Sequence, residues 1–139
     1  MTAFFIPFHM KLMLVLFLFG HLVNGQNLDH YLWKNRVILL FDSSSQLGEA
    51  KAQLKVLNSA QKELIERDVI VLQIPRNEQV NLLQQLKITN DFSGLVLLGK
   101  DGGVKLKQRY VVEAKTLFAL IDAMPMRRAE MQQKFNQKH

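Results

Sequence analysis

Two continuous apolar runs flank one amphipathic helix, and this pattern constrains the fold more than any other feature of the chain. The runs, residues 37–41 and 69–74, are rich in aliphatic and β-branched side chains, which is typical of strands buried on both faces. Between them the apolar residues recur at steps of three and four, as on one helix face: Ala50, Leu54, Leu57, Ala60 and Leu64. The pattern leaves no room for a hairpin, so we expect two parallel strands joined in a βαβ unit.

The second half of the chain adds a short helix that begins at Pro75 and Asn77, a hairpin and a final helix. Residues 95–98 form a third apolar strand, and residues 99–103 contain an Asp-Gly pair typical of a tight turn. The next strand alternates apolar and charged residues, as an antiparallel strand near a sheet edge does. A helix over about 113–124 ends at Pro125, and we expect 126–135 to form a short helix on the body of the domain, followed by a disordered tail.

This order of elements is that of the thioredoxin-like fold. It predicts an α/β protein with a mixed central sheet, in which a parallel βαβ unit is followed by an antiparallel ββ hairpin and helices flank the sheet. We expect the thioredoxin-like domain to span residues 26–126, with residues 127–139 forming a basic C-terminal helix and tail.

Residues 1–25 resemble a signal peptide. Lys11 precedes the apolar run 12–19, which is shorter than the roughly 20 residues of a membrane span, and Val23 and Gly25 are the small residues of a cleavage site. Cleavage there would leave one domain with a formal net charge lowered from +6 by the loss of Lys11. We therefore expect a secreted or periplasmic protein. Counting the apolar stretch as 3–23 leaves an uncleaved membrane anchor as the alternative.

The chain has no cysteine, which excludes thiol–disulfide exchange. In a thioredoxin-like enzyme the reactive cysteine follows the first core strand, at the start of the next helix. Residues 42–46 hold that place here, and residues 91–94 lack the proline that clamps substrate in thioredoxins. The serine hydroxyls and free helix amides could instead bind an anion, while simple helix capping is the structural alternative. The candidate anion-binding residues are Ser43, Ser44 and Ser45.

Several segments carry a sharper resemblance. They are residues 28–41, 66–69, 98–106 and, most specifically, 117–128, which read LFALIDAMPMRR. Together they resemble a secreted domain family of unknown function. It occurs as single-domain bacterial proteins and in vertebrate Sushi-repeat-containing and coiled-coil-domain-containing matrix proteins. The resemblance implies a peroxiredoxin- or thioredoxin-like fold without an established enzymatic activity.

Candidate catalytic and metal-binding groups are sparse. Beyond residue 25 the only histidines are His30 and the terminal His139, so a serine nucleophile has no evident base. Histidine and cysteine clusters are absent from the sequence, and its carboxylates are not spaced as in a calcium loop. We expect no cofactor, no bound metal and no nucleic-acid partner.

A basic surface is the other candidate site. Lys105, Lys107 and Arg109 alternate along one strand, and Arg127 and Arg128 follow the last helix, so the five could form one patch for a sulfated glycan, an anionic lipid or an acidic protein. The alternative is a solvated strand face plus an arginine pair bound to Asp122 or Glu130.

The sequence thus favours an exported, non-catalytic binding or interaction module. A cysteine-free enzyme or redox accessory that uses the thioredoxin-like cleft is the alternative. A membrane partner is expected only if residues 1–25 are retained. We also expect Trp33 to anchor the core just before the first strand, and the methionines near the C-terminus to fill it.

Overall fold

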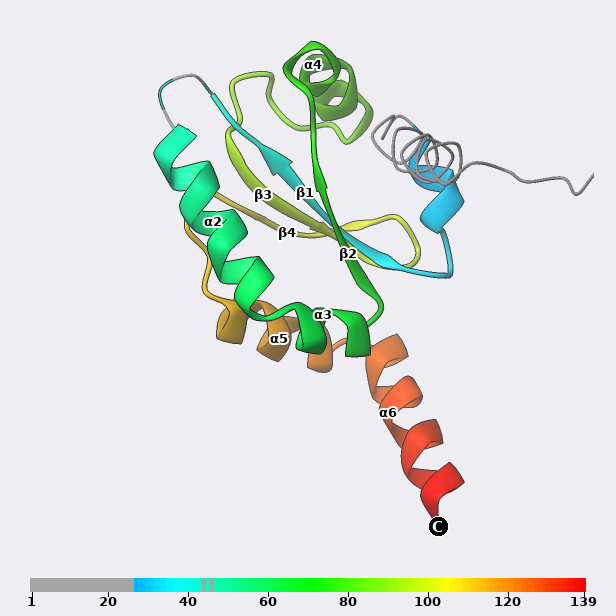
Figure 1. The fold of residues 1–139 in the computed structure, drawn as a ribbon. Helices are drawn as coiled ribbons and strands as arrows, with labels where there is room; N and C mark the ends of the chain where they lie inside the picture. The colour runs from blue at the N-terminus through cyan, green and yellow to red at the C-terminus, as the bar shows by residue number, and fades with distance from the viewer. Residues whose placement is uncertain (1–26, 44, 46) are drawn as a thin grey trace, which may run out of the picture.

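A computed structural model describes residues 27–43, 45 and 47–139, so the predicted signal segment and Ser44 lie outside the described residues. In chain order the elements are η1 (Leu28–Tyr31), β1 (Arg36–Phe41), α2 (Leu47–Ser59), α3 (Gln61–Glu66), β2 (Val69–Gln73), α4 (Arg76–Gln85), β3 (Gly94–Leu98), β4 (Val104–Gln108), α5 (Ala114–Asp122) and α6 (Pro125–Lys138) (Figure 1).

The four strands form one mixed sheet in the order β2-β1-β3-β4. β1 runs parallel to β2, with Val37 opposite Ile70, and antiparallel to β3, with Leu39 opposite Val96. β3 and β4 form the predicted antiparallel hairpin. The predicted α/β class and its mixed sheet are confirmed, and the arrangement is consistent with a thioredoxin-like fold.

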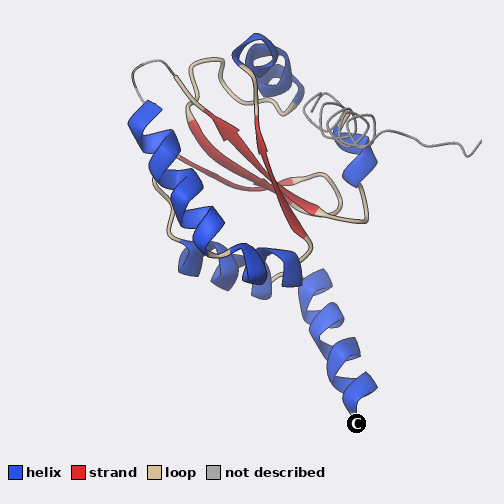
Figure 2. Ribbon diagram, viewed as in Figure 1, coloured by secondary structure: helices blue, strands red, loops and turns tan. Residues whose placement is uncertain are grey.

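Helices cover both faces of this sheet (Figure 2). Side chains alternate along the central strand β1, so Val37, Leu39 and Phe41 pack in the cluster under α4, which also includes Leu28 and Tyr31 of η1. The alternate residues of β1 pack in a second cluster with residues of α2, α3 and α5. Each fully buried aliphatic or aromatic side chain contributes about 1.5–3 kcal/mol to folding. The position of β1 between two cores explains its unbroken apolar run.

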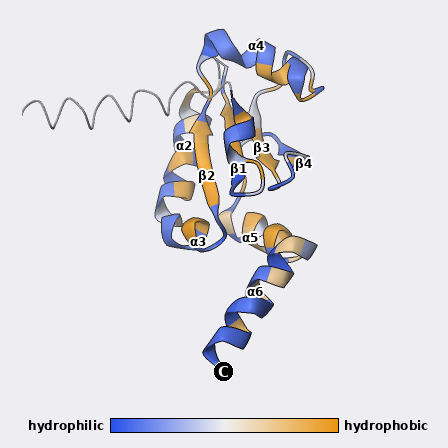
Figure 3. Ribbon diagram, turned by 90° about the vertical axis from the view of Figure 1, so that its right-hand side faces the viewer, coloured by the Kyte–Doolittle hydropathy of each residue, from blue (hydrophilic) through white to orange (hydrophobic). Residues whose placement is uncertain are grey.

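β2 differs from the prediction of a fully buried strand. It is an edge strand, and only Val69 is buried, while the rest of the strand is half-buried or exposed. β1 has a hydrogen-bonded neighbour on each side, whereas β2 has a neighbour on one side only. Figure 3 shows β2 as a hydrophobic strand between the more polar helix α2 and the neighbouring strand β1.

The helices also depart from the prediction at two places. The helix expected over 47–66 is divided at Ala60 into α2 and α3. The C-terminal segment forms a 14-residue helix, α6, in place of a short helix with a disordered tail. α6 points away from the sheet beyond its first turns (Figure 1), and most of its length is hydrophilic (Figure 3).

Trp33 does not anchor the core. It follows η1 in a turn, at a φ of 64°, and its side chain is 68% exposed. Its backbone N–H donates to the carbonyl of Lys100 at 2.7 Å, which fixes the main chain and directs the indole outward. Leu28 and Tyr31 pack against the core in its place.

Gly94, the first residue of β3, permits a close approach between strands. Its φ of +154° lies in the range that favours glycine, and an added Cβ would collide with the carbonyl oxygen of Gln108. The absence of a side chain therefore allows β4 to lie against this end of β3.

Candidate functional site

The basic strand predicted from the sequence lies at the open edge of the sheet. β4 is the terminal strand of the sheet. Lys105 and Lys107 lie on it, Arg109 directly follows it, and all three side chains are exposed. Lys105 Nζ pairs with Asp101 at 3.1 Å, and Lys107 Nζ lies 5.9 Å from the ring centroid of Phe92. Lys107 and Arg109 form no ion pair within the described part of the chain. Two unpaired cations on an open edge could therefore bind an anionic partner.

Arg127, by contrast, faces the interior. Only 2% of its surface is exposed. Its Nε donates to Asp122 at 3.2 Å, and its Nη1 and Nη2 donate to the backbone carbonyl and the carboxylate of Glu66 at 3.3 and 3.4 Å. Arg128, next to it on α6, is exposed. We leave Arg127 out of the surface patch, because its guanidinium is committed to internal oxygens.

A second buried arginine anchors the start of α6. Arg36 is 1% exposed, and its two terminal nitrogens each donate to one carboxylate oxygen of Glu130 at 3.2 Å. Lys100 Nζ lies 2.7 Å from Glu130 and 2.9 Å from Asp68. Burial alone would raise the pKa of the Glu130 carboxyl, but the hydrogen bonds from Lys100 and Arg36 outweigh it and lower that pKa. These pairs join β1, the β3–β4 turn and α6.

Arg67 extends the same ion-pair network toward α5. Its Nε and Nη2 donate to the two oxygens of Asp122 at 2.9 and 2.8 Å, and its guanidinium lies 4.4 Å from the ring centroid of Phe118. The hydrogen bond from Arg67 and, to a smaller degree, that from Arg127 lower the pKa of the Asp122 carboxyl. The hydrogen bond to Asp122 in turn raises the pKa of Arg67. Every charged group of this network is paired with an opposite charge, so the network ties together β1, the β3–β4 turn, α3, α5 and α6.

The serine segment lies beside a cleft where β1 and β2 end. The hydroxyl oxygens of Ser43 and Ser45 are 3.0 Å apart, within hydrogen-bond distance of each other, while Ser44 lies outside the described residues. Asp42 accepts a hydrogen bond from Gln79 at 3.0 Å. The Asp42 carboxylate opposes the binding of an anion at this end of the sheet.

The cleft itself has a volume of about 340 Å³, and Asp42, Arg76 and Tyr110 line it. The Tyr110 hydroxyl is buried and has no hydrogen-bond partner among the described residues. Burial and, to a smaller degree, the charge of Asp42 raise the pKa of Tyr110. At neutral pH this group is therefore a hydrogen-bond donor and not a phenolate.

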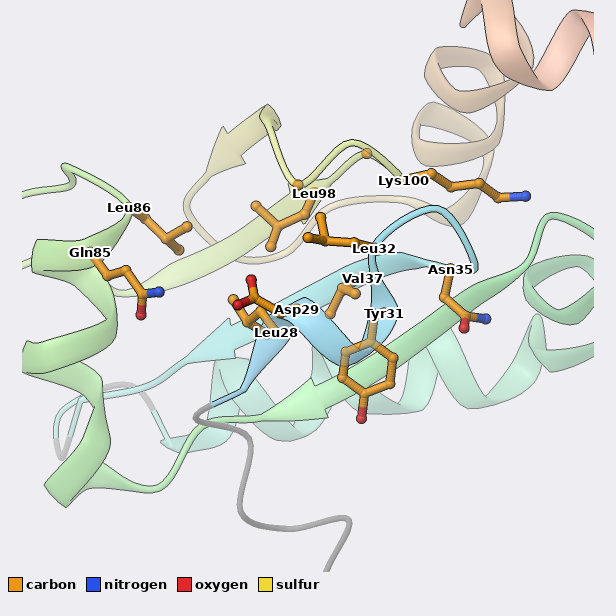
Figure 4. Close-up of a pocket in the computed structure, with 12 residues that line it drawn as sticks. Leu28, Asp29, Tyr31, Leu32, Asn35, Val37, Gln85, Leu86, Leu98 and Lys100 are labelled. Atoms are coloured by element: carbon orange, nitrogen blue, oxygen red, sulfur yellow. The ribbon is translucent and has the colours of Figure 1, made fainter.

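A further pocket, of about 190 Å³, lies between η1, β1, the β3–β4 turn and the end of α4. Figure 4 shows leucines and a valine from these elements gathered around it: Leu28, Leu32, Val37, Leu86 and Leu98. Polar side chains stand around them: Asp29, Asn35, Gln85 and Lys100. Sequence reasoning missed this pocket, because its walls come from four segments without a shared motif.

Metal-binding and membrane-spanning features are absent from the described residues. They contain no group of three or more histidine, cysteine, aspartate or glutamate side chains placed to hold a metal ion. His30 is exposed, with its ring centroid 5.2 Å from that of Tyr31. Within the described range, no helix has both the length and the apolar character needed to cross a membrane.

Comparison with known proteins gave one match. A family model described as a domain of unknown function (DUF4174) matches residues 27–130, which run from the residue before η1 to Glu130 in α6. None of the curated proteins and none of the solved structures searched matches the chain.

Proposed function

The chain belongs to the DUF4174 family of domains of unknown function, and we propose that this member is an exported, non-catalytic module that binds a polyanion. The supporting observation is the open edge of the sheet, where Lys107 and Arg109 are exposed without a carboxylate partner. Lys105 is bound only to the exposed Asp101, in a surface pair of the kind that contributes at most about 1 kcal/mol. All three cations are therefore available to a ligand.

The partner class follows from this chemistry. A row of cations on one strand attracts an extended polyanion at long range, and the attraction weakens as salt screens it. A sulfated glycan or an acidic protein segment presents such charges outside the cell. Export rests on residues 1–25, whose sequence resembles a signal peptide.

A cysteine-free enzyme or redox accessory acting in the cleft beside Asp42 is the second candidate. The unpartnered Tyr110 hydroxyl favours it, because a buried donor without a partner is costly unless a ligand or water satisfies it. The hydroxyls of Ser43 and Ser45 bond to each other, and none of the histidines that the structure describes lines the cleft. The cleft therefore supports ligand binding better than it supports catalysis.

Heparin chromatography tests the first proposal. We expect the protein to elute above physiological salt, about 0.15 M. Reversal of the β4 charges in Lys105→Glu/Lys107→Glu/Arg109→Glu should move elution to low salt. The matched control is Lys51→Glu/Lys55→Glu/Lys62→Glu, which changes the formal charge equally at exposed positions of α2 and α3.

Two results would contradict the proposal. Elution of the unmodified protein at low salt would show that β4 is an ordinary solvated strand. An equal loss of retention in the α2–α3 control would show that net charge, rather than the β4 surface, determines binding.

A further inference from the structure

A cavity of about 320 Å³ lies where the β3–β4 turn meets the junction of α5 and α6. We call it the junction cavity. Its wall contains three cationic side chains and three consecutive apolar ones: Arg36, Lys100, Lys105, Met124, Pro125 and Met126. Asp101 and Gly99 complete the lining. None of the candidate sites predicted from the sequence is this cavity, although Lys105 belongs to both the cavity and the β4 surface.

The cationic part of the wall includes an unsatisfied buried donor. Arg36 is 1% exposed, its two terminal nitrogens are bound to Glu130, and its Nε has no hydrogen-bond partner within the described residues. A buried N–H group without a hydrogen bond is unfavourable, because it has lost its bonds to water and gained none in the protein. Arg36 thus brings to the cavity that it lines a positive charge with one donor left without a partner.

The charge balance of the wall favours an anion. The carboxylates that neutralise Arg36 and Lys100 are Glu130 and Asp68, and neither lines the cavity. Asp101 is the single acid in the wall, and its bond to Lys105 is exposed and therefore easily exchanged. Lys105 can thus turn from Asp101 to an incoming anion at little cost.

The apolar part of the wall indicates that the anionic ligand also carries an apolar group. Methionine side chains are flexible and polarisable, so Met124 and Met126 can adapt to an aliphatic chain. We propose that the junction cavity binds a small amphipathic carboxylate, with its chain against Met124, Pro125 and Met126. Its carboxylate accepts a hydrogen bond from Lys105 and lies in the positive field of Arg36 and Lys100, which also line the cavity.

Methionine methyl NMR of the full chain with sodium octanoate tests this directly. Met131 lies on α6 but does not line the cavity, so it serves as an internal control. We expect saturable shifts of the Met124 and Met126 methyl signals, assigned by leucine substitution, and no shift of the Met131 signal. Octan-1-ol, which has the same chain without the charge, should bind about tenfold more weakly or worse.

Variants separate the cavity from the β4 surface. Met126→Glu places a negative charge at a position that is 39% exposed, and it should weaken octanoate binding at least about tenfold. Val80→Glu makes the same kind of change on α4 at an exposed position and should have no effect. Lys107→Glu/Arg109→Glu alters the heparin surface but no cavity residue, so octanoate binding should persist even if heparin binding is lost.

The proposal would be overturned by equal affinity for octanoate and octan-1-ol, or by equal weakening in Met126→Glu and Val80→Glu. Shifts of the Met131 methyl as large as those of Met124 and Met126 would also overturn it, because they would indicate nonspecific association with the protein.

Discussion

Gln53 shows what a single polar residue contributes to this fold. It lies within the apolar face of α2 and is 0% exposed. It forms two hydrogen bonds with the backbone of Val112. Its side-chain N–H donates to the carbonyl of Val112 at 3.0 Å, and its side-chain oxygen accepts from the N–H of Val112 at 2.6 Å. The segment before α5 thus has its backbone satisfied by a side chain of α2. Sequence reasoning did not single out Gln53, although a glutamine on the apolar face of a helix was the signal.

Replacement of this amide should be costly. We expect Gln53→Leu, which is similar in size but cannot hydrogen-bond, to lower the free energy of unfolding by about 2–4 kcal/mol. The reason is that it leaves a buried N–H and a buried carbonyl of Val112 unpaired. Urea unfolding followed by circular dichroism measures this. Gln84→Leu at an exposed position of α4 is the control, and a similar loss there would show that the amide bonds of Gln53 are not responsible.

At the scale of elements, α6 is anchored at one end only. Arg127 and Glu130, in its first two turns, bind residues of α3, α5, β1 and the β3–β4 turn, whereas Phe135 is 63% exposed. One weak hydrogen bond, from Lys134 Nζ to the carbonyl of Glu66 at 3.5 Å, lies further along. The position of α6 therefore depends on ion pairs rather than on apolar burial.

Loss of the Glu130 charge should release this anchor. In Glu130→Gln the buried Arg36 loses its bidentate carboxylate, and breaking a buried pair from one side costs on the order of 3 kcal/mol. We expect faster amide hydrogen exchange through α6 and little change in β1 and β3. Glu49→Gln, at an exposed position of α2, is the control. Unchanged protection of α6 would mean that its position does not depend on Glu130.

The sequence predicted the positions of helices and strands better than it predicted which side chains are buried. Apolar runs and turn residues located β1, β3, the Asp-Gly turn and the helix after Pro75, because these depend on local periodicity. The sequence did not decide whether Arg127 is buried. Its burial depends on hydrogen bonds to Asp122 and to Glu66, which is 61 residues away in the chain. Trp33 was placed wrongly, because a positive-φ turn directs its side chain to solvent and periodicity does not reveal that.

The same limit applies to the candidate sites. The exposure of Lys107 and Arg109 followed from strand alternation. The junction cavity could not be predicted, because it combines the start of β1, a hairpin turn and a helix junction that are distant in sequence. Motif reasoning finds residues that are close together along the chain, and here the enclosed spaces are formed by residues that are far apart.

For the whole molecule, the ion-pair network makes stability depend on pH. The pKa values of Asp122 and Glu130 are lowered from their ordinary values of 3.8 and 4.5. Groups with lowered pKa values stabilise the fold above those ordinary values, and the contribution is lost as the pH falls toward the folded-state pKa values. We expect the urea midpoint to be nearly constant from about pH 6 to 8 and to fall below about pH 4.5.

A variant tests whether Asp122 causes the loss of stability at low pH. Asp122→Asn should be less stable than the unmodified protein at pH 7, and the difference should shrink as the pH is lowered toward 3, because protonation then removes the same charge from the unmodified chain. A constant difference across this range would assign the acid sensitivity to other carboxyl groups.

The outward position of Trp33 also determines how the tryptophan fluorescence of this protein responds to unfolding. It is the only tryptophan in the chain, and its indole is in contact with water in the folded state. Its emission should already be that of a hydrated indole, so unfolding changes the fluorescence little. Its backbone is bound to Lys100, which lines the junction cavity. Intrinsic fluorescence is therefore a poor probe of unfolding for this protein, although its single indole lies beside the β3–β4 turn.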